Sequence, residues 1–147
     1  MKQEKFEVGS QAWIDEFRRV AQGLCEEALA VGTLSKDESF RLVESYYDTP
    51  AHIAPDGVVT ISVTLENGTI EVTEEAIDAP NMNIRGAYPV ITQLAKLKHD
   101  GGMMPSADAQ AIMRKACALR QLIIIGPDVP KPVALLPMHD LMAERSQ

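Results

Sequence analysis

GVVTISVTLENGTIEVTEE, residues 57–75, decides the fold class. On both sides of Asn67-Gly68, apolar and polar residues alternate, which is the period of a strand with one buried face. Asn and Gly tolerate positive φ, so this dipeptide predicts a two-residue hairpin turn that pairs Glu66 with Thr69 and Leu65 with Ile70. In this register one face of the hairpin is apolar, and it consists of Val59, Ile61, Val63, Leu65, Ile70 and Val72.

Helical spacing precedes the hairpin. Apolar residues recur every three or four positions between Ser10, the expected N-cap, and Gly32, the expected C-terminal stop. This stripe predicts a first helix and consists of Trp13, Phe17, Val20, Ala21, Leu24, Ala28 and Leu29. Ser35 and Glu38 have the spacing of a capping box, so a second helix is expected to follow. Its buried face would be formed by Phe40, Val43 and Tyr47.

The second half of the chain alternates between short strands and helices. A strand is expected from about Asn81 to Arg85, ended by Gly86, and a helix over AYPVITQLAKLKH. Residues 99–106 then read as a flexible loop. Ser106 caps a further helix, with a stripe formed by Ile112, Met113, Ala116, Cys117 and Leu119.

The last strand and the closing segment are strongly apolar. Gln121 to Ile125 predicts a strand, and because Leu122–Ile125 are all apolar, we expect it to be covered on both faces or central in its sheet. Gly126-Pro127-Asp128 ends this strand, and Leu135 to Glu144 predicts an apolar C-terminal helix. The fold class expected from these elements is α+β: N-terminal helices, then a small, mainly antiparallel sheet with helices packed on one face, and the apolar C-terminal helix.

Composition excludes several classes of function. The chain has 147 residues, which fits a single domain, with residues 1–9 expected to be flexible. The net charge is −7 and no run of Lys and Arg occurs, which argues against nucleic acid and anionic membranes as partners. No stretch of about 18 apolar residues predicts a membrane span. No signal peptide is recognised, so the expected location is cytoplasmic. Cys25 and Cys117 are both expected to be buried.

The order of elements from about Gly57 to Met142 resembles the sterol carrier protein domain family. The resemblance rests on the hairpin quoted above, on APNMNIRGAYPVITQLAKL as a strand that leads into a helix, and on QLIIIGPD followed by an apolar helix. It implies a tunnel that binds sterols, fatty acids or fatty acyl thioesters without a catalytic residue. The chain differs from the family in a longer segment between His99 and Leu119, and in Pro130 and Pro132 before the last helix.

The candidate ligand-binding residues are therefore apolar. They come from the hairpin, the following helix, a glycine-rich loop and the C-terminal segment, and they are Val63, Leu65, Ile70, Ile91, Leu94, Leu97, Met103, Met104, Leu136, Met138 and Leu141. Methionines suit such a surface because they adapt to variable apolar partners. Leu135 and Met142 would join the C-terminal residues as a movable cover over one end of the cavity.

No catalytic residue, metal ion or cofactor is expected. His52, His99 and His139 lack the spacing of a helical metal site, and His139-Asp140 reads as a polar helix edge. The leading hypothesis is a non-catalytic carrier of an apolar small molecule. The alternatives are a small isomerase or hydratase acting on a similar molecule, and a homodimeric interaction subunit whose C-terminal segment packs on its partner.

Overall fold

The computed structural model describes residues 4–100 and 104–147. Its elements are α1 (Gln11–Val31), β1 (Phe40–Tyr47), β2 (Val59–Glu66), β3 (Thr69–Thr73), β4 (Met82–Ala87), α2 (Tyr88–Ala95), β5 (His99–Asp100), β6 (Met104–Pro105), α3 (Ala107–Ala118), β7 (Leu122–Ile125), the 3-10 turn η1 (Val133–Leu135) and α4 (Met138–Ala143). The larger sheet has the strand order β3-β2-β1-β4-β7. β1 and β4 run parallel, whereas β1–β2, β2–β3 and β4–β7 are antiparallel. The α+β class and the mainly antiparallel sheet are confirmed.

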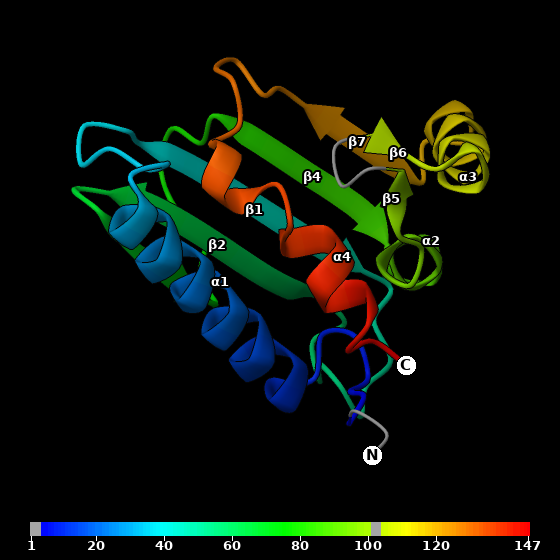
Figure 1. Ribbon diagram of the computed structural model, residues 1–147. Helices are drawn as coiled ribbons and strands as arrows, with labels where there is room; N and C mark the ends of the chain where they lie inside the picture. Colours follow the sequence, from blue (N-terminus) through cyan, green and yellow to red (C-terminus); the bar gives the residue numbers. More distant parts are fainter. Residues whose placement is uncertain (1–3, 101–103) are drawn as a thin grey trace.

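One face of the large sheet carries the helical layer. α1 crosses this face diagonally, and η1 and α4 lie beside it, as Figure 1 shows. α2 and α3 pack against each other at the end of the sheet where β4 and β7 lie (Figure 1). We call the covered side the inner face. The core forms between this face and the helices, and it includes Trp13, Phe17, Phe40, Ile61 and Leu65.

The hairpin has the predicted register. Glu66 pairs with Thr69 and Leu65 with Ile70. Asn67 and Gly68 adopt φ of 52° and 76°, as the two-residue turn requires. The six residues of the predicted apolar face are all buried.

We expect Gly68→Val to destabilise the protein by about 1 kcal/mol or more, because a β-branched residue resists positive φ. A Cβ atom at this position would also lie 3.2 Å from Lys36 Cγ. Thermal unfolding followed by circular dichroism should show Tm lowered by about 3 °C or more. Asn67→Gly is the matched control, because glycine also accepts positive φ, and its Tm should stay within about 2 °C of the wild type. An unchanged Tm for Gly68→Val would contradict this account of the turn.

The first helix is confirmed. Ser10 Oγ accepts a hydrogen bond from the Trp13 backbone N–H at 3.2 Å, and Gly32 ends the helix at φ 81°. The face of α1 that includes Trp13, Phe17 and Ala21 is buried. Phe6 pairs with Ser146 before this helix begins, and Val8 is buried. The flexibility expected for residues 1–9 and the single-domain organisation stay predictions.

The expected second helix is wrong, because this segment forms β1. The Glu38 carboxylate accepts from the Ser35 N–H at 2.8 Å, as in a capping box. Ser35 Oγ, however, accepts from the Asp37 N–H only two residues later, which makes a turn and not a helix start. The strand then pairs with β2 on one side and β4 on the other, so both of its edges are hydrogen-bonded. This pairing overrides the helical spacing of Phe40, Val43 and Tyr47.

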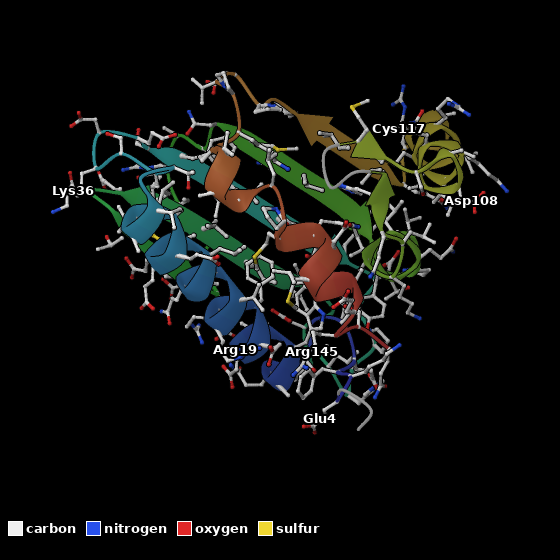
Figure 2. All side chains as sticks on the ribbon, viewed as in Figure 1. Glu4, Arg19, Lys36, Asp108, Cys117 and Arg145 are labelled. Atoms are coloured by element: carbon white, nitrogen blue, oxygen red, sulfur yellow. The ribbon has the colours of Figure 1, made fainter. Side chains whose placement is uncertain are left out.

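The expectation that the last strand is covered on both faces is also wrong. β7 lies at the edge of the sheet, and Ile123 and Ile125 on its outer side are 48% and 65% exposed. An all-apolar tetrapeptide does not distinguish an edge strand from a central one. Cys117 is exposed on α3 and not buried (Figure 2), whereas Cys25 is buried as expected.

Several boundaries differ from the predictions. The helix expected over residues 87–99 ends at Ala95, and the one expected from Leu135 to Glu144 is limited to α4, Met138–Ala143. Gly86 lies inside β4 and does not end it. A Cβ atom there would approach Ile91 Cδ1 to 2.8 Å, so the absence of a side chain allows α2 to pack closely on β4. The expected loop at residues 99–106 contains the short β5–β6 pair.

Candidate binding pocket

A pocket of about 340 Å³ lies between the inner face of the sheet and the helical layer. Its walls come from α1, η1, α4, α2, α3 and the inner sides of β1, β2, β3, β4 and β7. Most lining side chains are apolar, and the aromatic ones among them are Trp13, Phe17, Phe40 and Tyr46. Small-molecule pockets in proteins range over roughly 300–1,000 Å³, so this one has the size of a small apolar ligand.

Six of the predicted binding residues line this pocket. They are Val63 and Ile70 of the hairpin, Ile91 and Leu94 of α2, and Leu136 and Met138 of the C-terminal segment. Met82, Met113 and Met142 also line it. Whether these side chains contact a ligand stays a prediction.

The other predicted residues lie elsewhere. Leu65 is fully buried in the core away from the lining, and half-buried Leu97 follows the end of α2. Met104 and Leu141 are 62% and 37% exposed, so their side chains are turned toward solvent. Met103 lies outside the described residues. Periodicity places Leu97 and Leu141 on apolar faces, but α2 ends at Ala95, before Leu97, and Leu141 faces solvent on α4, so neither lines the pocket.

The C-terminal segment forms one side of the pocket. Leu135 and Met142 line it together with Leu136 and Met138. The segment is fastened to residues 97–99: His139 Nε2 donates to the Leu97 carbonyl oxygen at 2.5 Å, and Asp140 Oδ1 accepts from the His99 N–H at 2.6 Å. The rings of His99 and His139 stack with centroids 3.8 Å apart.

The end of the chain is held against α1. Trp13 Nε1–H donates to Ser146 Oγ at 2.9 Å in a buried bond. Arg145 lies beside the start of α1 and pairs with Glu16 at 3.4 Å (Figure 2). These contacts place the C-terminal segment as a fixed wall of the pocket in this structure. The ability of this wall to shift stays a prediction.

Glu44 is the most unusual group in the pocket, and sequence analysis did not find it. It lies on the inner side of β1 among apolar residues and contributes to the lining. Its Oε1 accepts a hydrogen bond from the Tyr46 hydroxyl at 3.0 Å. Burial raises the pKa of the Glu44 carboxyl, and the Tyr46 hydrogen bond and the charges of Lys131 and His139 only partly offset this. Burial likewise raises the pKa of Tyr46 well above its ordinary value.

This raised pKa predicts how stability depends on pH. The folded protein binds the Glu44 proton more tightly than the unfolded chain does. Glu44 therefore lowers the free energy of unfolding as pH rises from the ordinary pKa of 4.5 through the raised pKa of the folded state. In Glu44→Gln the group does not titrate. We therefore expect the free energy of unfolding of Glu44→Gln, relative to wild type, to increase across this window. Urea unfolding between about pH 4 and pH 8 measures the difference. Glu44→Leu should show the same trend, and a difference independent of pH would contradict the prediction.

The opening of the pocket is marked by Lys131. Among the lining residues that the structure describes, it is the exposed one, whereas the rest are buried or half-buried. It therefore lies where the pocket meets solvent. Two other cations have partners of their own: Arg85 stacks on Tyr47 at 5.4 Å, and Lys98 pairs with Glu144 at 2.6 Å. Neither contributes to the lining.

Comparison with known proteins gives structural matches only. No protein-family model and no curated protein sequence matches the chain. A solution structure of a conserved hypothetical protein from Thermus thermophilus, described as possibly a sterol carrier protein, is 13% identical with a TM-score of 0.49, covering 99% of this chain and 94% of that one. Sterol carrier protein 2 is 12% identical with a TM-score of 0.47, over 96% and 100% of the two chains. A UbiJ-SCP2 ubiquinone synthesis protein is 9% identical with a TM-score of 0.37, over 85% and 96%.

Sterol carrier protein 2 is thus among the solved structures that this chain matches. The low identities leave the ligand to be argued from the pocket itself. No helix in residues 4–100 and 104–147 has the length and apolar composition to cross a bilayer. Within the same ranges, no three His, Cys, Asp or Glu side chains come together as metal ligands. The expected lack of a cofactor and the cytoplasmic location stay predictions.

Proposed function

We propose that the protein binds and carries an apolar small molecule, such as a sterol, a fatty acid or a fatty acyl thioester, in the pocket under α1 and α4. The observation that supports this function is the pocket itself. It is apolar over most of its wall, has a volume of about 340 Å³ and reaches solvent beside Lys131. Burying apolar ligand surface in such a site contributes roughly 25 cal/mol per Å².

Two measurements test this function. Native mass spectrometry of the purified protein reports a retained apolar molecule and the oligomeric mass together. Binding of phenylnaphthylamine, a neutral apolar fluorophore, reports the pocket directly. Ala109 lines the pocket and is 3% exposed, whereas Ala111 in the same helix is exposed.

Ala109→Phe should therefore fill the pocket and weaken fluorophore binding about tenfold or more, because the aromatic ring takes the place of the ligand. Ala111→Phe is the matched control and should keep the wild-type affinity. Equal affinity in both variants would place the binding site elsewhere. Circular dichroism establishes that both variants are folded.

An enzyme acting on a similar apolar molecule is the second candidate, and Glu44 favours it. A carboxyl with a raised pKa in a pocket has the property of a general acid or base. If a substrate is found and Glu44→Gln abolishes its turnover while binding is retained, the protein is an isomerase or hydratase and not a carrier. Homodimerisation stays a prediction, which the native mass tests.

A further inference from the structure

The inner face of β1 carries one carboxylate between apolar neighbours. Glu44 is paired with Ile61 on β2 and with Ile84 on β4, so an isoleucine lies next to it on each neighbouring strand. Ile61 is fully buried and Ile84 lines the pocket. A carboxyl placed among such residues costs free energy unless its oxygens are hydrogen-bonded.

Among the described residues, a hydrogen-bond donor reaches only one of the two carboxyl oxygens. Oε1 accepts from the Tyr46 hydroxyl at 3.0 Å. Across residues 4–100 and 104–147, no protein group donates to Oε2, and Glu44 contributes to the lining of the pocket. Tyr46 has used its single donor on Oε1. With no donor among the described residues, Oε2 is left to accept from the contents of the pocket, either water or a polar group of the ligand.

The surrounding charges limit what that polar group can be. Lys131 at the opening and His139 on α4 are near enough to act on the Glu44 carboxyl, and they oppose a cationic head group. A carboxylate head group beside Oε2 would place two like charges in contact, which forces one of them to take up a proton. A neutral hydroxyl avoids both costs, because it donates to a carboxylate and accepts from a protonated carboxyl.

We propose that the pocket prefers an apolar molecule with a neutral hydroxyl group at one end, and that Oε2 of Glu44 binds this hydroxyl. This inference rests on the proposed function and adds a residue that determines specificity. The hydroxyl replaces a water molecule at Oε2, and the hydrocarbon part of the ligand lies against Leu136, Met138 and Met142. An alcohol is bound in preference to the carboxylic acid of the same chain length.

The test compares three probes that share one hydrocarbon chain. Dodecanol, dodecanoate and dodecane are measured by displacement of phenylnaphthylamine from wild type, Glu44→Gln, Glu44→Leu and Glu71→Gln. Glu71 is exposed on β3, so Glu71→Gln removes the same charge outside the pocket. Glu44→Gln is nearly isosteric, and it carries the test if Glu44→Leu does not fold.

In wild type we expect dodecanol to bind more tightly than dodecanoate. Glu44→Leu should weaken dodecanol about tenfold or more, which is the effect of losing a hydrogen bond to a charged group. Both Glu44 variants should bind dodecanoate more tightly than wild type does, so the ratio of alcohol to acid affinity falls. Dodecane should bind no more weakly in Glu44→Leu than in wild type, and Glu71→Gln should change none of the affinities.

The outcomes separate this inference from the function on which it rests. If wild type binds none of the three probes and no phenylnaphthylamine, both are overturned. If wild type binds the fluorophore and dodecane but the ratio of alcohol to acid affinity is the same in wild type and in the Glu44 variants, only the role of Glu44 is overturned. A fall in the ratio in both Glu44 variants, with Glu71→Gln unchanged, supports it.

Discussion

A chain that ends after Pro132 is expected to lose binding of phenylnaphthylamine and most of its stability. The deletion removes Leu135, Leu136, Met138 and Met142 from the wall of the pocket. Burial of each such side chain stabilises the fold by roughly 2 kcal/mol, and the four together approach the whole stability of a typical domain, about 5–15 kcal/mol. The deletion also leaves Trp13 Nε1–H without its bond to Ser146.

Fluorophore titration and thermal unfolding measure the two effects of the deletion. A matched pair of point variants in α4 separates the pocket wall from the rest of the helix. Met142→Ala, at a side chain that is 4% exposed, should cost about 2–5 kcal/mol. Leu141→Ala, at 37% exposure, should cost less than about 1 kcal/mol. If the shortened chain binds the fluorophore as tightly as the full chain, the C-terminal segment is no part of the site. If a dimer instead becomes a monomer, the segment belongs to a subunit interface.

Gly126→Ala is expected to destabilise the protein by more than about 3 kcal/mol and to lower Tm by about 10 °C. Gly126 ends β7 at φ 90°, where a side chain is strained. A Cβ atom there would lie 2.3 Å from the carbonyl oxygen of Asn81 and 3.2 Å from Met82 Cα. Both are backbone atoms, and the Asn81 oxygen also accepts from the Asp128 N–H at 3.1 Å. The clash can therefore be relieved only by moving β7 or β4.

Two other glycines are the controls for this variant. Gly32 has nearly the same φ, 81°, but nothing lies within 4 Å of its Cβ position, so Gly32→Ala should show only the backbone strain, about 1 kcal/mol. Gly23 lies in the interior of α1 with open space around it, and Gly23→Ala should stabilise the protein by about 0.5–1 kcal/mol. Equal Tm values for Gly126→Ala and Gly32→Ala would show that the backbone contact is not rigid.

The hairpin could be predicted from sequence because the residues that specify it are close together in the chain. Alternation on both sides of Asn67-Gly68 specifies the strands, the turn and the register together, and each point is confirmed. The first helix was predictable for the same reason, since Ser10 and Gly32 mark its ends. Six of the pocket residues followed from these and similar patterns. The pocket forms where apolar faces of distant segments meet. Sequence periodicity describes each face separately and does not specify which faces contact one another.

β1 was not predicted as a strand, and the reason is Glu44, the carboxyl in the pocket. Its inner face reads Phe40, Leu42, Glu44, Tyr46, so a charge interrupts the apolar alternation of an ordinary strand. Without that alternation, the helical spacing of Phe40, Val43 and Tyr47 is the stronger pattern. Local rules fail most often where a side chain serves a site and not the fold. A lone acidic residue between apolar neighbours at strand spacing is the signal that could have identified Glu44.

The parallel pairing of β1 with β4 also has a kinetic consequence. The β2–β3 hairpin lies between these strands in the sequence, so the Arg41 N–H reaches the side-chain oxygen of Asn81 forty residues away. Closing a loop of that size lowers the entropy of the chain before the β1–β4 contacts stabilise it. The two-residue turn of the hairpin has a much smaller closure cost and forms faster. We expect the hairpin amides to gain protection first in pulsed hydrogen exchange during refolding, and those of β4 later. Glu44 then remains in contact with water for much of the folding reaction, and it is desolvated only when β4 joins the sheet and the helices cover it.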